Sequence, residues 1–558
     1  MVQLFNGICI FAAVFIVTAV NSQSSDLVVS TIYGKIEGFR YTTPNGTETE
    51  VFLGIPYAAP PVGNLRFEKS IPPNPWTTTR QAKAFGATCL SLPKFSSPTA
   101  SEDCLFINII KPKAPSSDPK GYPILLWIHG GAFATGSSSD YPYNATAERL
   151  VAKGVIYASI NYRQSAFGFF STGNSKAPGN YGVWDQIQAI KFLKKVAKSF
   201  GGNPKSITPF GQSSGGITVS LLSLAPATNN LFDRSIDMSG SSNFQLNDFK
   251  LNINYSLQLA DTLGCGCSTN PKNCLKTKTS LEIQNALASV PLGGAFWPRI
   301  DDGDLFPNVT YEKLVQRAPK RDIWFSLNNQ EYLVFAVAGA LPSSSNLYPI
   351  STGQAANFSE IDFVNIVNGA VATQQNYGDR RQEVAEKIID FYLNQTHYNT
   401  SRNFYLQIYA QLITDFSYNI RTMREAKKRA AAGQKVYFSV NNFLPASMNN
   451  VYFEGVGHSR ELHYLFNGIL GLPMVPLVGD EAAAQKTYSD LFVTFAKTGI
   501  PSSGALTVPR LTSPSAIPNI QIYPSSYIQQ DLWKDRIDFW DSIAATYGYD
   551  LPEQRKLF

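Results

Sequence analysis

Short apolar runs alternate with amphipathic stretches along most of the chain. Runs at 123–128, 207–210 and 322–327 are mainly apolar, which is typical of strands buried on both faces of a parallel sheet. The stretch from 185 to 199 instead repeats apolar side chains at helical spacing. Strands that alternate with helices predict an α/β fold in which a central, mostly parallel sheet is flanked by helices.

The composition favours a large folded core. Of the 558 residues, 44% are hydrophobic and 13% are aromatic, which supplies enough apolar surface to build one. This length by itself suggests several domains. However, no linker rich in Ser and Gly, no low-complexity tract and no internal repeat divides the chain, so a single sheet is the economical interpretation.

The two ends of the chain carry targeting information. Residues 8–20 form an apolar core that is short for a membrane span, and the small residue Ser22 suggests cleavage before Gln23. We therefore expect a signal peptide at 1–22 and a mature chain at 23–558. No Lys or Arg precedes the apolar core, so a short membrane anchor stays an alternative. The final residues, RKLF, are no retention signal, which favours secretion over the endoplasmic reticulum lumen.

The first candidate for chemistry is the run GQSSG at 211–215, which lies between an apolar strand and the run GITV at 216–219. This order of strand, sharp turn and helix raises a serine hydroxyl above the edge of a sheet. Ser213 is therefore the candidate nucleophile. Gly and Ser are common residues, so the pattern needs support from its context.

A glycine-rich turn, HGGAF at 129–133, follows the strand at 123–128. The backbone N–H groups of Gly130 and Gly131 are unshielded by β-carbons. Together with the N–H of Ser214 they predict an oxyanion hole, a set of donors for the negative charge that develops during acyl transfer. Taken alone, this motif favours an ordinary Gly-Gly turn over an oxyanion hole.

The chain has four histidines, and acyl transfer by serine near neutral pH needs one of them as the base. His129 belongs to the glycine turn, and His397 lies between overlapping glycosylation sequons that mark an exposed loop. Of the remaining two, His458 follows a Gly-Val-Gly turn, whereas His463 lies in an amphipathic run. We prefer His458 as the base and keep His463 as the alternative.

In this hydrolase architecture the acid lies between the nucleophile and the base along the chain. The strand at 322–327 is followed by a loop that ends in Glu331. Because catalytic groups gather at the carboxyl edge of such sheets, Glu331 is on the correct edge and Asp322 on the wrong one. A solvated loop carboxylate is the alternative interpretation of Glu331.

Several segments in fixed order resemble the type B carboxylesterase and cholinesterase family of α/β-hydrolases. They are FLGIPYA at 52–58, PPVGNLRF at 60–67, EDCLFIN at 102–108, NYR at 161–163, GNYG at 179–182 and FGGNP at 200–204. The resemblance covers most of the chain and implies the α/β-hydrolase fold in a single large domain. It implies a triad of Ser213, Glu331 and His458, an oxyanion hole at Gly130, Gly131 and Ser214, and support of the acid by Ser239.

Three positions depart from the family pattern. Pro209 stands where a branched apolar residue is usual, and it removes one hydrogen-bond donor from the strand before the elbow. Tyr332 replaces a glycine after the acid, which predicts different loop dihedrals. Gln212 replaces a common glutamate before the nucleophile and removes a negative charge beside the triad. These changes affect rate and specificity more than the chemistry itself.

After loss of Cys9 with the signal peptide, five cysteines remain. A bond between Cys89 and Cys104 would close a loop of about 15 residues, worth roughly 3 kcal/mol. The resemblance implies that pair and a second one between Cys265 and Cys274, with Cys267 left as a free thiol. From the sequence, a bond between Cys267 and Cys274 stays an alternative. A metal site at the clustered cysteines lacks histidine neighbours.

The remaining signals bound the partners. Sequons predict glycosylation at Asn45, Asn144, Asn254, Asn308, Asn357, Asn394 and Asn399. The net charge of +6 is small for this length and spread along the chain, so it indicates solubility and excludes a nucleic-acid partner. No phosphate loop, dinucleotide fingerprint or metal-ligand spacing appears, so we expect no cofactor and no metal. The oligomeric state is not predicted.

The expected substrate is a small, neutral ester. Cholinesterases hold a quaternary ammonium on a tryptophan inside the first disulfide loop, whereas the loop from Cys89 to Cys104 contains Leu90 and Phe95 but no Trp. The segment 292–296, LGGAF, predicts a roomy acyl pocket. Two other functions stay open: an acyltransferase using the same triad, and a non-catalytic adhesion protein of the same family.

Overall fold

The computed structural model describes residues 27–93, 96–245, 249–290, 296–336, 350–394, 403–444, 454–467 and 477–558. The predicted signal peptide at 1–22, and the predicted features at Phe95, 292–295, His397 and Asn399, lie outside these residues.

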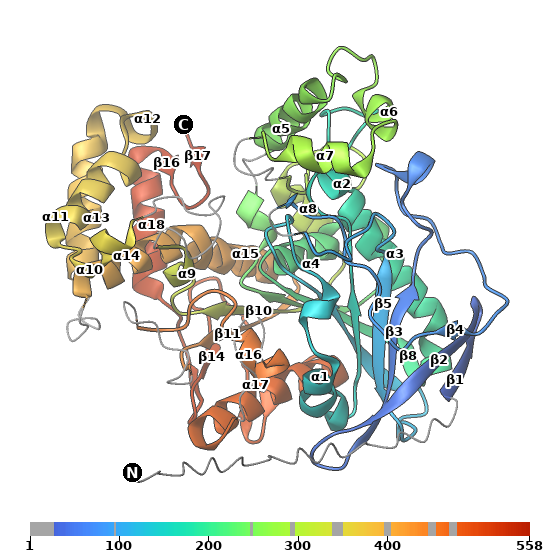
Figure 1. The fold of residues 1–558 in the computed structure, drawn as a ribbon. Helices are drawn as coiled ribbons and strands as arrows, with labels where there is room; N and C mark the ends of the chain where they lie inside the picture. Colours follow the sequence, from blue (N-terminus) through green and yellow to red (C-terminus); the bar gives the residue numbers. More distant parts are fainter. Residues whose placement is uncertain are drawn as a thin grey trace, which may run out of the picture.

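A sheet of 13 strands runs through the middle of the described chain (Figure 1). Its order is β1-β2-β3-β5-β7-β6-β8-β9-β10-β11-β14-β15, with β4 beside β2. The strands of this sheet are β1 (Leu27–Thr31), β2 (Gly34–Thr42), β3 (Glu48–Pro56), β4 (Arg80–Gln81), β5 (Phe106–Pro112), β6 (Tyr122–Ile128), β7 (Ile156–Ile160), β8 (Gly202–Gln212), β9 (Arg234–Met238), β10 (Asp322–Asn328), β11 (Lys435–Asn441), β14 (Asn519–Ile522) and β15 (Tyr527–Gln529). Strands β7 to β14 along this order are all parallel. The outer pairs are antiparallel except β2–β4, which is parallel. The mostly parallel sheet predicted from the apolar runs is confirmed.

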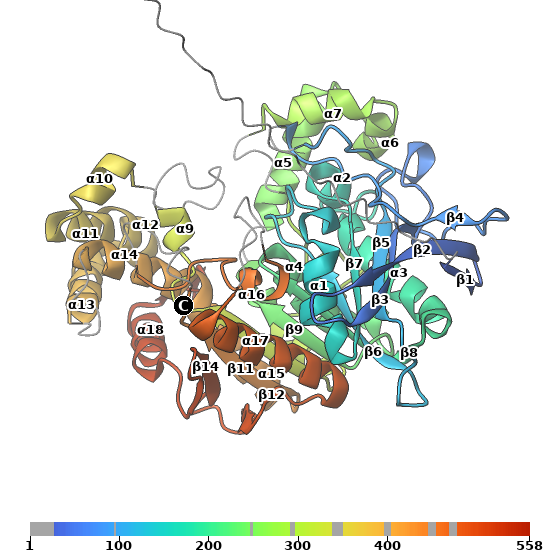
Figure 2. The same ribbon diagram turned by 60° about the horizontal axis from the view of Figure 1, so that its bottom comes forward.

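Helices cover both faces of the sheet (Figures 1 and 2). They are α1 (Tyr143–Arg149), α2 (Ser165–Phe169), α3 (Tyr181–Val196), α4 (Ser214–Leu224), α5 (Phe249–Thr262), α6 (Pro271–Lys276), α7 (Ser280–Leu287), α8 (Tyr311–Arg317), α9 (Leu333–Ala336), α10 (Thr352–Ala356), α11 (Glu360–Ile366), α12 (Gln374–Tyr377), α13 (Arg381–Leu393), α14 (Phe404–Thr414), α15 (Ile420–Ala431), α16 (Leu462–Phe466), α17 (Gly479–Thr498) and α18 (Lys534–Tyr547). In this part of the chain, no helix is both long and apolar enough to cross a membrane.

The buried strand β6 shows how one strand serves both layers. Its side chains point alternately to opposite faces. Ile124, Leu126 and Ile128 pack among residues of α3 and α4, whereas Leu125 and Trp127 pack among residues of α16 and α17. A strand with apolar neighbours on both faces reads as a continuous apolar run, which is why β6 could be predicted from the sequence.

Helices α14 and α15 are joined without a loop by a π-helical turn at Asp415–Asn419. A π-helix bonds residue i to i+5 instead of i to i+4, so each hydrogen-bonded turn encloses one residue more than in an α-helix. This turn is buried throughout. It lies in the helical group beside β10 and β11, which Figure 1 shows on the left of the sheet.

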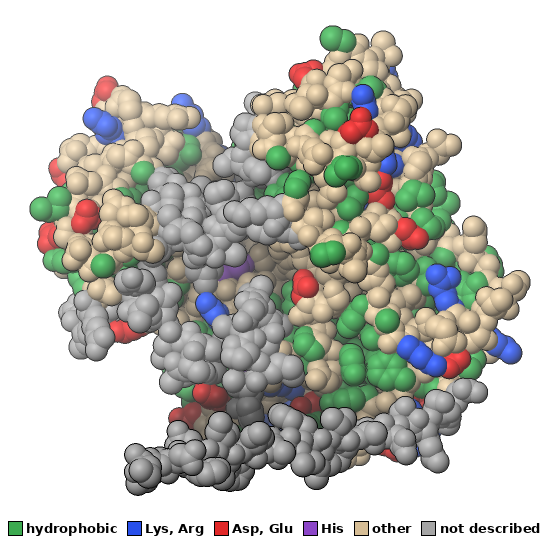
Figure 3. Space-filling model, in the orientation of Figure 1, with side chains coloured by type: hydrophobic (Ala, Val, Ile, Leu, Met, Phe, Trp, Pro, Cys, Tyr) green, Lys and Arg blue, Asp and Glu red, His purple; other side chains and the backbone are tan. Residues whose placement is uncertain are grey.

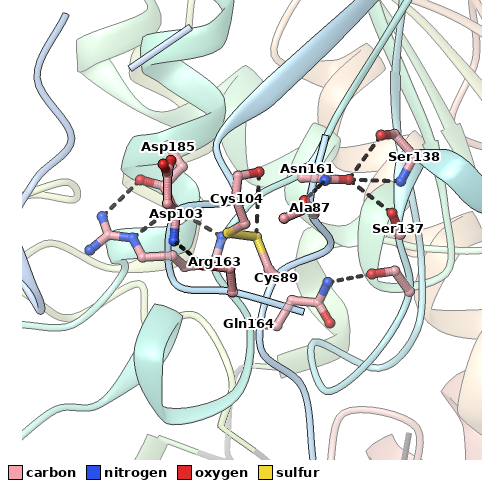
Figure 4. Close-up of a disulfide and its surroundings, with 12 residues drawn as sticks. Ala87, Cys89, Asp103, Cys104, Ser137, Ser138, Asn161, Arg163, Gln164 and Asp185 are labelled. Atoms are coloured by element: carbon pink, nitrogen blue, oxygen red, sulfur yellow. Dashed lines mark hydrogen bonds and ion pairs between the residues drawn. A yellow bond between two sulfur atoms is a disulfide. The ribbon is translucent and has the colours of Figure 1, made fainter. Parts of the chain in front are cut away.

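Two disulfides form, Cys89–Cys104 with a Cα–Cα distance of 4.9 Å and Cys265–Cys274 with 5.6 Å. Cys267 is exposed and free, so the alternative bond from Cys267 to Cys274 is absent from this structure. Figure 4 shows the first disulfide beside Asn161 at the end of β7. The amide of Asn161 donates to Ala87 O at 2.9 Å and accepts from the backbone N of Ser138 at 2.8 Å. The disulfide closes a loop that lies before β5, and the amide of Asn161 connects this loop to the one that follows β6.

We expect Cys104→Ser to lower the free energy of unfolding by about 3 kcal/mol, the value for a lost bridge across a loop of this length. Chemical denaturation of the purified protein measures the change. Cys267→Ser is the matched control and should leave stability unchanged, because Cys267 is exposed and free. Peptide mapping without reductant gives a direct test. A Cys89 peptide recovered as a free thiol, or joined to Cys267, would contradict this pairing.

Candidate active site

Ser213 occupies the turn between the end of β8 and the start of α4. Its backbone has φ 59° and ψ −127°, a strained conformation for a residue with a side chain. The turn closes tightly, since a β-carbon on Gly215 would lie 2.1 Å from Ile128 O and one on Gly211 would lie 2.6 Å from Gly215 C. Only glycine fits at these two positions. The turn therefore holds the partly exposed Ser213 at the carboxyl end of β8.

Pro209 does not interrupt β8. The strand pairs with β6 from Ile124↔Ile207 to Ile128↔Gly211, and Pro209 lies within this register. On the other side, pairing with β9 begins only at Phe210↔Ile236. The missing N–H of Pro209 therefore falls outside the β8–β9 ladder, and the strand stays continuous up to the elbow.

His458 and Glu331 form a buried pair at the carboxyl end of β10. His458 Nδ1 lies 2.7 Å from Glu331 Oε2, and the His458 backbone N donates to Glu331 O at 3.1 Å. The other carboxylate oxygen, Oε1, accepts from Ser239 Oγ at 2.6 Å and from Asn328 N at 2.7 Å. Since Nδ1 faces a carboxylate, it carries the proton in the neutral ring. Nε2 is then left as an acceptor, the state that a general base needs.

Tyr332, which follows the acid, keeps an ordinary backbone, because it is absent from the residues with positive φ. Its N–H donates to Thr414 Oγ1 at 2.9 Å. The loop after Glu331 therefore accommodates a side chain at this position, and the expected difference of its dihedrals from those of the family stays a prediction.

Two aromatic rings pack against the His458 ring. The centroid of Phe335 lies 5.3 Å away and that of Tyr418 lies 5.1 Å away. Phe335 belongs to α9, and Tyr418 lies in the π-helical turn. Such turns are frequent at functional sites. The sequence analysis missed both rings, because neither carries a local signal that relates it to His458.

In the described part of the chain, the alternative candidates, His463, His129 and Asp322, form no hydrogen bond with Glu331 and take no part in its pair with His458. His463 is buried in α16, where burial lowers its pKa to about 4, and among the described residues neither of its ring nitrogens has a hydrogen-bond partner. His129 Nδ1 contacts Gly130 O at 2.7 Å, and burial lowers the pKa of this ring also to about 4. Asp322 begins β10, at the opposite end of the strand from Glu331, and pairs with Lys435 at 3.3 Å.

The predicted oxyanion residues surround the elbow. A β-carbon on Gly130 would lie 3.1 Å from Ser213 Cβ, so the turn after β6 passes directly beside the candidate nucleophile. Gly131 has φ 118°, a backbone that favours glycine. Ser214 is the first residue of α4, where the N–H has no partner within the helix. These amides all lie at one end of the sheet next to Ser213.

The hydroxyl of Ser213 and the ring of His458 are not hydrogen-bonded to each other in the part of the chain that the structure describes. Instead, Gln212 Nε2 lies 3.2 Å from His458 Nε2. Gln212 is 2% exposed. Gln212, which replaces the glutamate of the family pattern, therefore contacts the candidate base directly.

A second buried acid lies behind Glu331. Glu461 follows His458 by three residues and is 1% exposed. Its Oε2 accepts from Asn328 Nδ2, and Asn328 Nδ2 also donates to Gly457 O at 3.1 Å. Burial, and then the charge of Glu331, raise the pKa of Glu461 to about 8. At neutral pH Glu461 is therefore mostly protonated, and Glu331 is spared a second negative charge nearby.

Histidine surface is visible at the bottom of a hollow in the face of the molecule drawn in Figure 3. Among the described histidines, His458 has an exposed fraction of 5%, compared with 0% for His129 and 1% for His463. The candidate base is therefore almost fully buried but is still reached by solvent. Across the described ranges, no group of three His, Cys, Asp or Glu side chains could hold a metal ion.

This combination of a parallel sheet, a serine at a strand-to-helix elbow and a histidine paired with a carboxylate defines the α/β-hydrolase fold. The model of the Carboxylesterase family matches residues 25–540. The chain therefore belongs to the carboxylesterase family and is a carboxylic ester hydrolase.

Three relatives illustrate this membership. Gut esterase 1 of Caenorhabditis briggsae is 34% identical over 548 residues, which cover 94% of either chain. Carboxylesterase 5A of Mus musculus is 37% identical over 317 residues, or 53% of this chain and 54% of the relative. The cholinesterase of Mus musculus is 30% identical over 503 residues, or 86% of this chain and 79% of the relative.

Proposed function

We propose that the protein is a secreted serine esterase that hydrolyses neutral carboxylic esters through Ser213, His458 and Glu331. The observation that carries this proposal is the bond of 2.7 Å between His458 Nδ1 and Glu331 Oε2, formed at the same sheet edge as the strained elbow of Ser213. A non-catalytic adhesion protein would have no need of a buried carboxylate that accepts bonds from three groups. The triad therefore favours an enzyme.

In the proposed reaction, Ser213 Oγ attacks the ester carbonyl while its proton passes to His458 Nε2. The negative charge that develops on the carbonyl oxygen is met by the N–H groups of Gly130, Gly131 and Ser214. Glu331 stabilises the imidazolium that forms. When the tetrahedral intermediate collapses, the alkoxide takes the proton from Nε2 and leaves as an alcohol. Water then cleaves the acyl-Ser213 ester by the same steps.

Secretion is proposed from the sequence of the first 22 residues and from the sequons. Of the predicted glycosylation sites within the described ranges, five are exposed and one, Asn144, is partly buried in α1; the exposed ones are Asn45, Asn254, Asn308, Asn357 and Asn394. Exposure is what attachment of a glycan requires. Two disulfides are also typical of an oxidising compartment.

Purification of the secreted chain, followed by assay of a short and a long nitrophenyl ester, tests the activity. An organophosphate should abolish both reactions, because it modifies the activated serine. Product analysis with an added alcohol separates hydrolysis from acyl transfer. If most of the acyl group is recovered on the alcohol and little as free acid, the acyltransferase replaces the hydrolase as the function.

We expect a preference for uncharged esters over choline esters. The loop between the first two disulfide cysteines has no Trp to bind a quaternary ammonium by cation–π contact, and Gln212 is neutral. A butyryl group should be accepted about as well as an acetyl group, since each methylene that an apolar pocket accepts gains up to about 0.8 kcal/mol. Comparison of kcat/KM values gives the answer. A tenfold preference for acetylcholine over a neutral acetate ester would contradict this expectation.

A further inference from the structure

Gln212 makes the contact to His458 that a serine nucleophile is expected to make. The ring nitrogen Nδ1 faces Glu331 and carries the proton, so Nε2 has a single lone pair that accepts one good hydrogen bond. The group that faces this lone pair at 3.2 Å is the side-chain amide nitrogen of Gln212, a donor. The amide N–H therefore occupies the acceptor to which the Ser213 proton has to move.

A second contact fixes the orientation of this amide. Ser459 Oγ donates to Gln212 Oε1 at 3.0 Å, so the oxygen points toward Ser459 and the nitrogen toward His458. Ser459 is a non-glycine residue with φ 67°, a strained backbone of the kind that clusters at functional sites. Gly130 also lies close to this amide, since a β-carbon on Gly130 would lie 3.2 Å from Gln212 Oε1.

This arrangement suits the neutral ring and opposes the charged one. When Nε2 takes the Ser213 proton, its N–H meets the amide N–H, and two donors face each other. The clash is relieved if the amide turns over, because Oε1 then accepts from the new N–H. That movement breaks the bond from Ser459 and requires the Gln212 amide to release Nε2 before the proton arrives.

We propose that Gln212 is a positioning residue: its amide, held by Ser459, caps His458 Nε2 in the resting enzyme and turns over during each proton transfer from Ser213. This inference rests on the proposed function, in which His458 is the general base. It goes beyond the loss of a charge at position 212, because it assigns a specific donor, a specific acceptor and a second residue that orients the donor.

Other groups around the ring also affect its protonation. Glu331 lies at Nδ1, and Tyr418 packs against one face of the ring. Asn328 links Glu461 to Glu331, because its backbone N–H donates to Glu331 and its side-chain amide donates to Glu461. None of these groups faces Nε2. Replacements at position 212 therefore change the partner of Nε2 and leave the other neighbours of the ring in place.

The test is the pH profile of kcat/KM. Gln212→Met keeps the size of the side chain and removes the donor to the neutral ring, so the acid limb should move up by about 0.5 to 1 pH unit. Gln212→Glu places a carboxylate at Nε2 and should move it further, by about 1 to 2 units. Ser459→Ala frees the amide to turn over and should move the limb in the same direction by a smaller amount.

Gln164→Met is the matched control. Gln164 is 0% exposed, and its Nε2 donates to Gly136 O at 2.7 Å without any bond to His458. Loss of this buried amide should leave the acid limb where it is. If the limb of Gln212→Glu moves by less than 0.5 unit, or moves to lower pH, the inference is overturned. If neither variant at position 212 folds, the acid limb of Ser459→Ala tests the inference, which fails if that limb stays in place or moves to lower pH.

A measurement without substrate separates this inference from the proposed function. The chain has 4 histidines, so NMR of protein labelled with ¹⁵N-histidine can follow each ring through a pH titration, with His458 assigned by its loss in His458→Gln. We expect the titration of His458 to shift in Gln212→Met and to stay unchanged in Ser213→Ala. The reverse pattern would show that Ser213 is the partner of Nε2 and would overturn the role of Gln212, whatever the enzyme hydrolyses.

Discussion

Ser213→Ala should lower kcat by about 10⁴-fold or more, the usual loss when a triad member is removed, while the protein still folds. The residue sits at the surface of the elbow, and the turn around it is held by backbone bonds such as Ser213 N to Met238 O at 2.9 Å. These bonds do not involve the hydroxyl, so stability should be retained. Turnover of a nitrophenyl ester and labelling with an organophosphate provide the two readouts.

Wild-type protein, expressed and purified in parallel, is the reference for folding, through its thermal unfolding curve. The assignment fails if Ser213→Ala still becomes labelled at another serine. If Ser213→Ala does not fold, its lack of activity says nothing about the role of the hydroxyl, so Ser213→Cys serves as a second variant. It preserves the size of the side chain and should still lose most of the esterase activity.

His458→Ala should cost a similar factor, about 10⁴-fold in kcat, whereas His463→Ala should keep activity within about tenfold of the wild type. The physical difference lies in their partners. His458 Nδ1 is bonded to Glu331, whereas the ring nitrogens of His463 have no hydrogen-bond partner among the described residues. Steady-state kinetics on one neutral ester distinguishes the two variants.

Removal of the buried His463 side chain leaves a cavity in the packing around α16 and is expected to reduce stability. Thermal unfolding should therefore be measured together with the kinetics. A variant that is less stable but active agrees with the assignment. If His463→Ala is folded and inactive while His458→Ala is active, the base has been assigned wrongly.

The elbow and the sheet could be predicted from the sequence because both depend on local constraints. Strands β6, β8 and β10 are buried on both faces, which produces continuous apolar runs. The glycines at 211 and 215 mark the elbow in the sequence, although the backbone atoms that require them include Ile128 O and His129 O at the distant end of β6. The helix expected at 185–199 is also present, although α3 begins at Tyr181 and the residues from Ala197 to Phe200 form a 3₁₀ turn. Helix ends are set by capping and packing that periodicity does not show.

The surroundings of the base could not be predicted, because they depend on contacts between distant segments. Glu331 and His458 are 127 residues apart, and no local pattern relates them to each other. The pair was suggested by the sheet edge expected for Glu331, the small number of histidines, the expected chain order and the family resemblance. Tyr418 reaches His458 through a π-helical turn, and an apolar pattern does not reveal one extra residue in a turn. The contact from the Gln212 amide to His458 depends on the hydrogen bond from Ser459, which orients the amide. The position of Ser459 in space cannot be read from the composition of its loop.

The π-helical turn also has a meaning for how such chains can change by insertion and deletion. Tyr418, inside the turn, packs on His458. Glu425, in α15 beyond the turn, accepts from Ser220 Oγ of α4 at 2.7 Å. The turn holds one residue more than the same stretch of α-helix would, so removal of one residue would let it become α-helical and keep α15 in register with α14. A single deletion at 415–419 would thus leave Glu425 near its partner but remove the bulge that holds Tyr418 on His458, so among descendants of this chain a gap there should accompany a changed site.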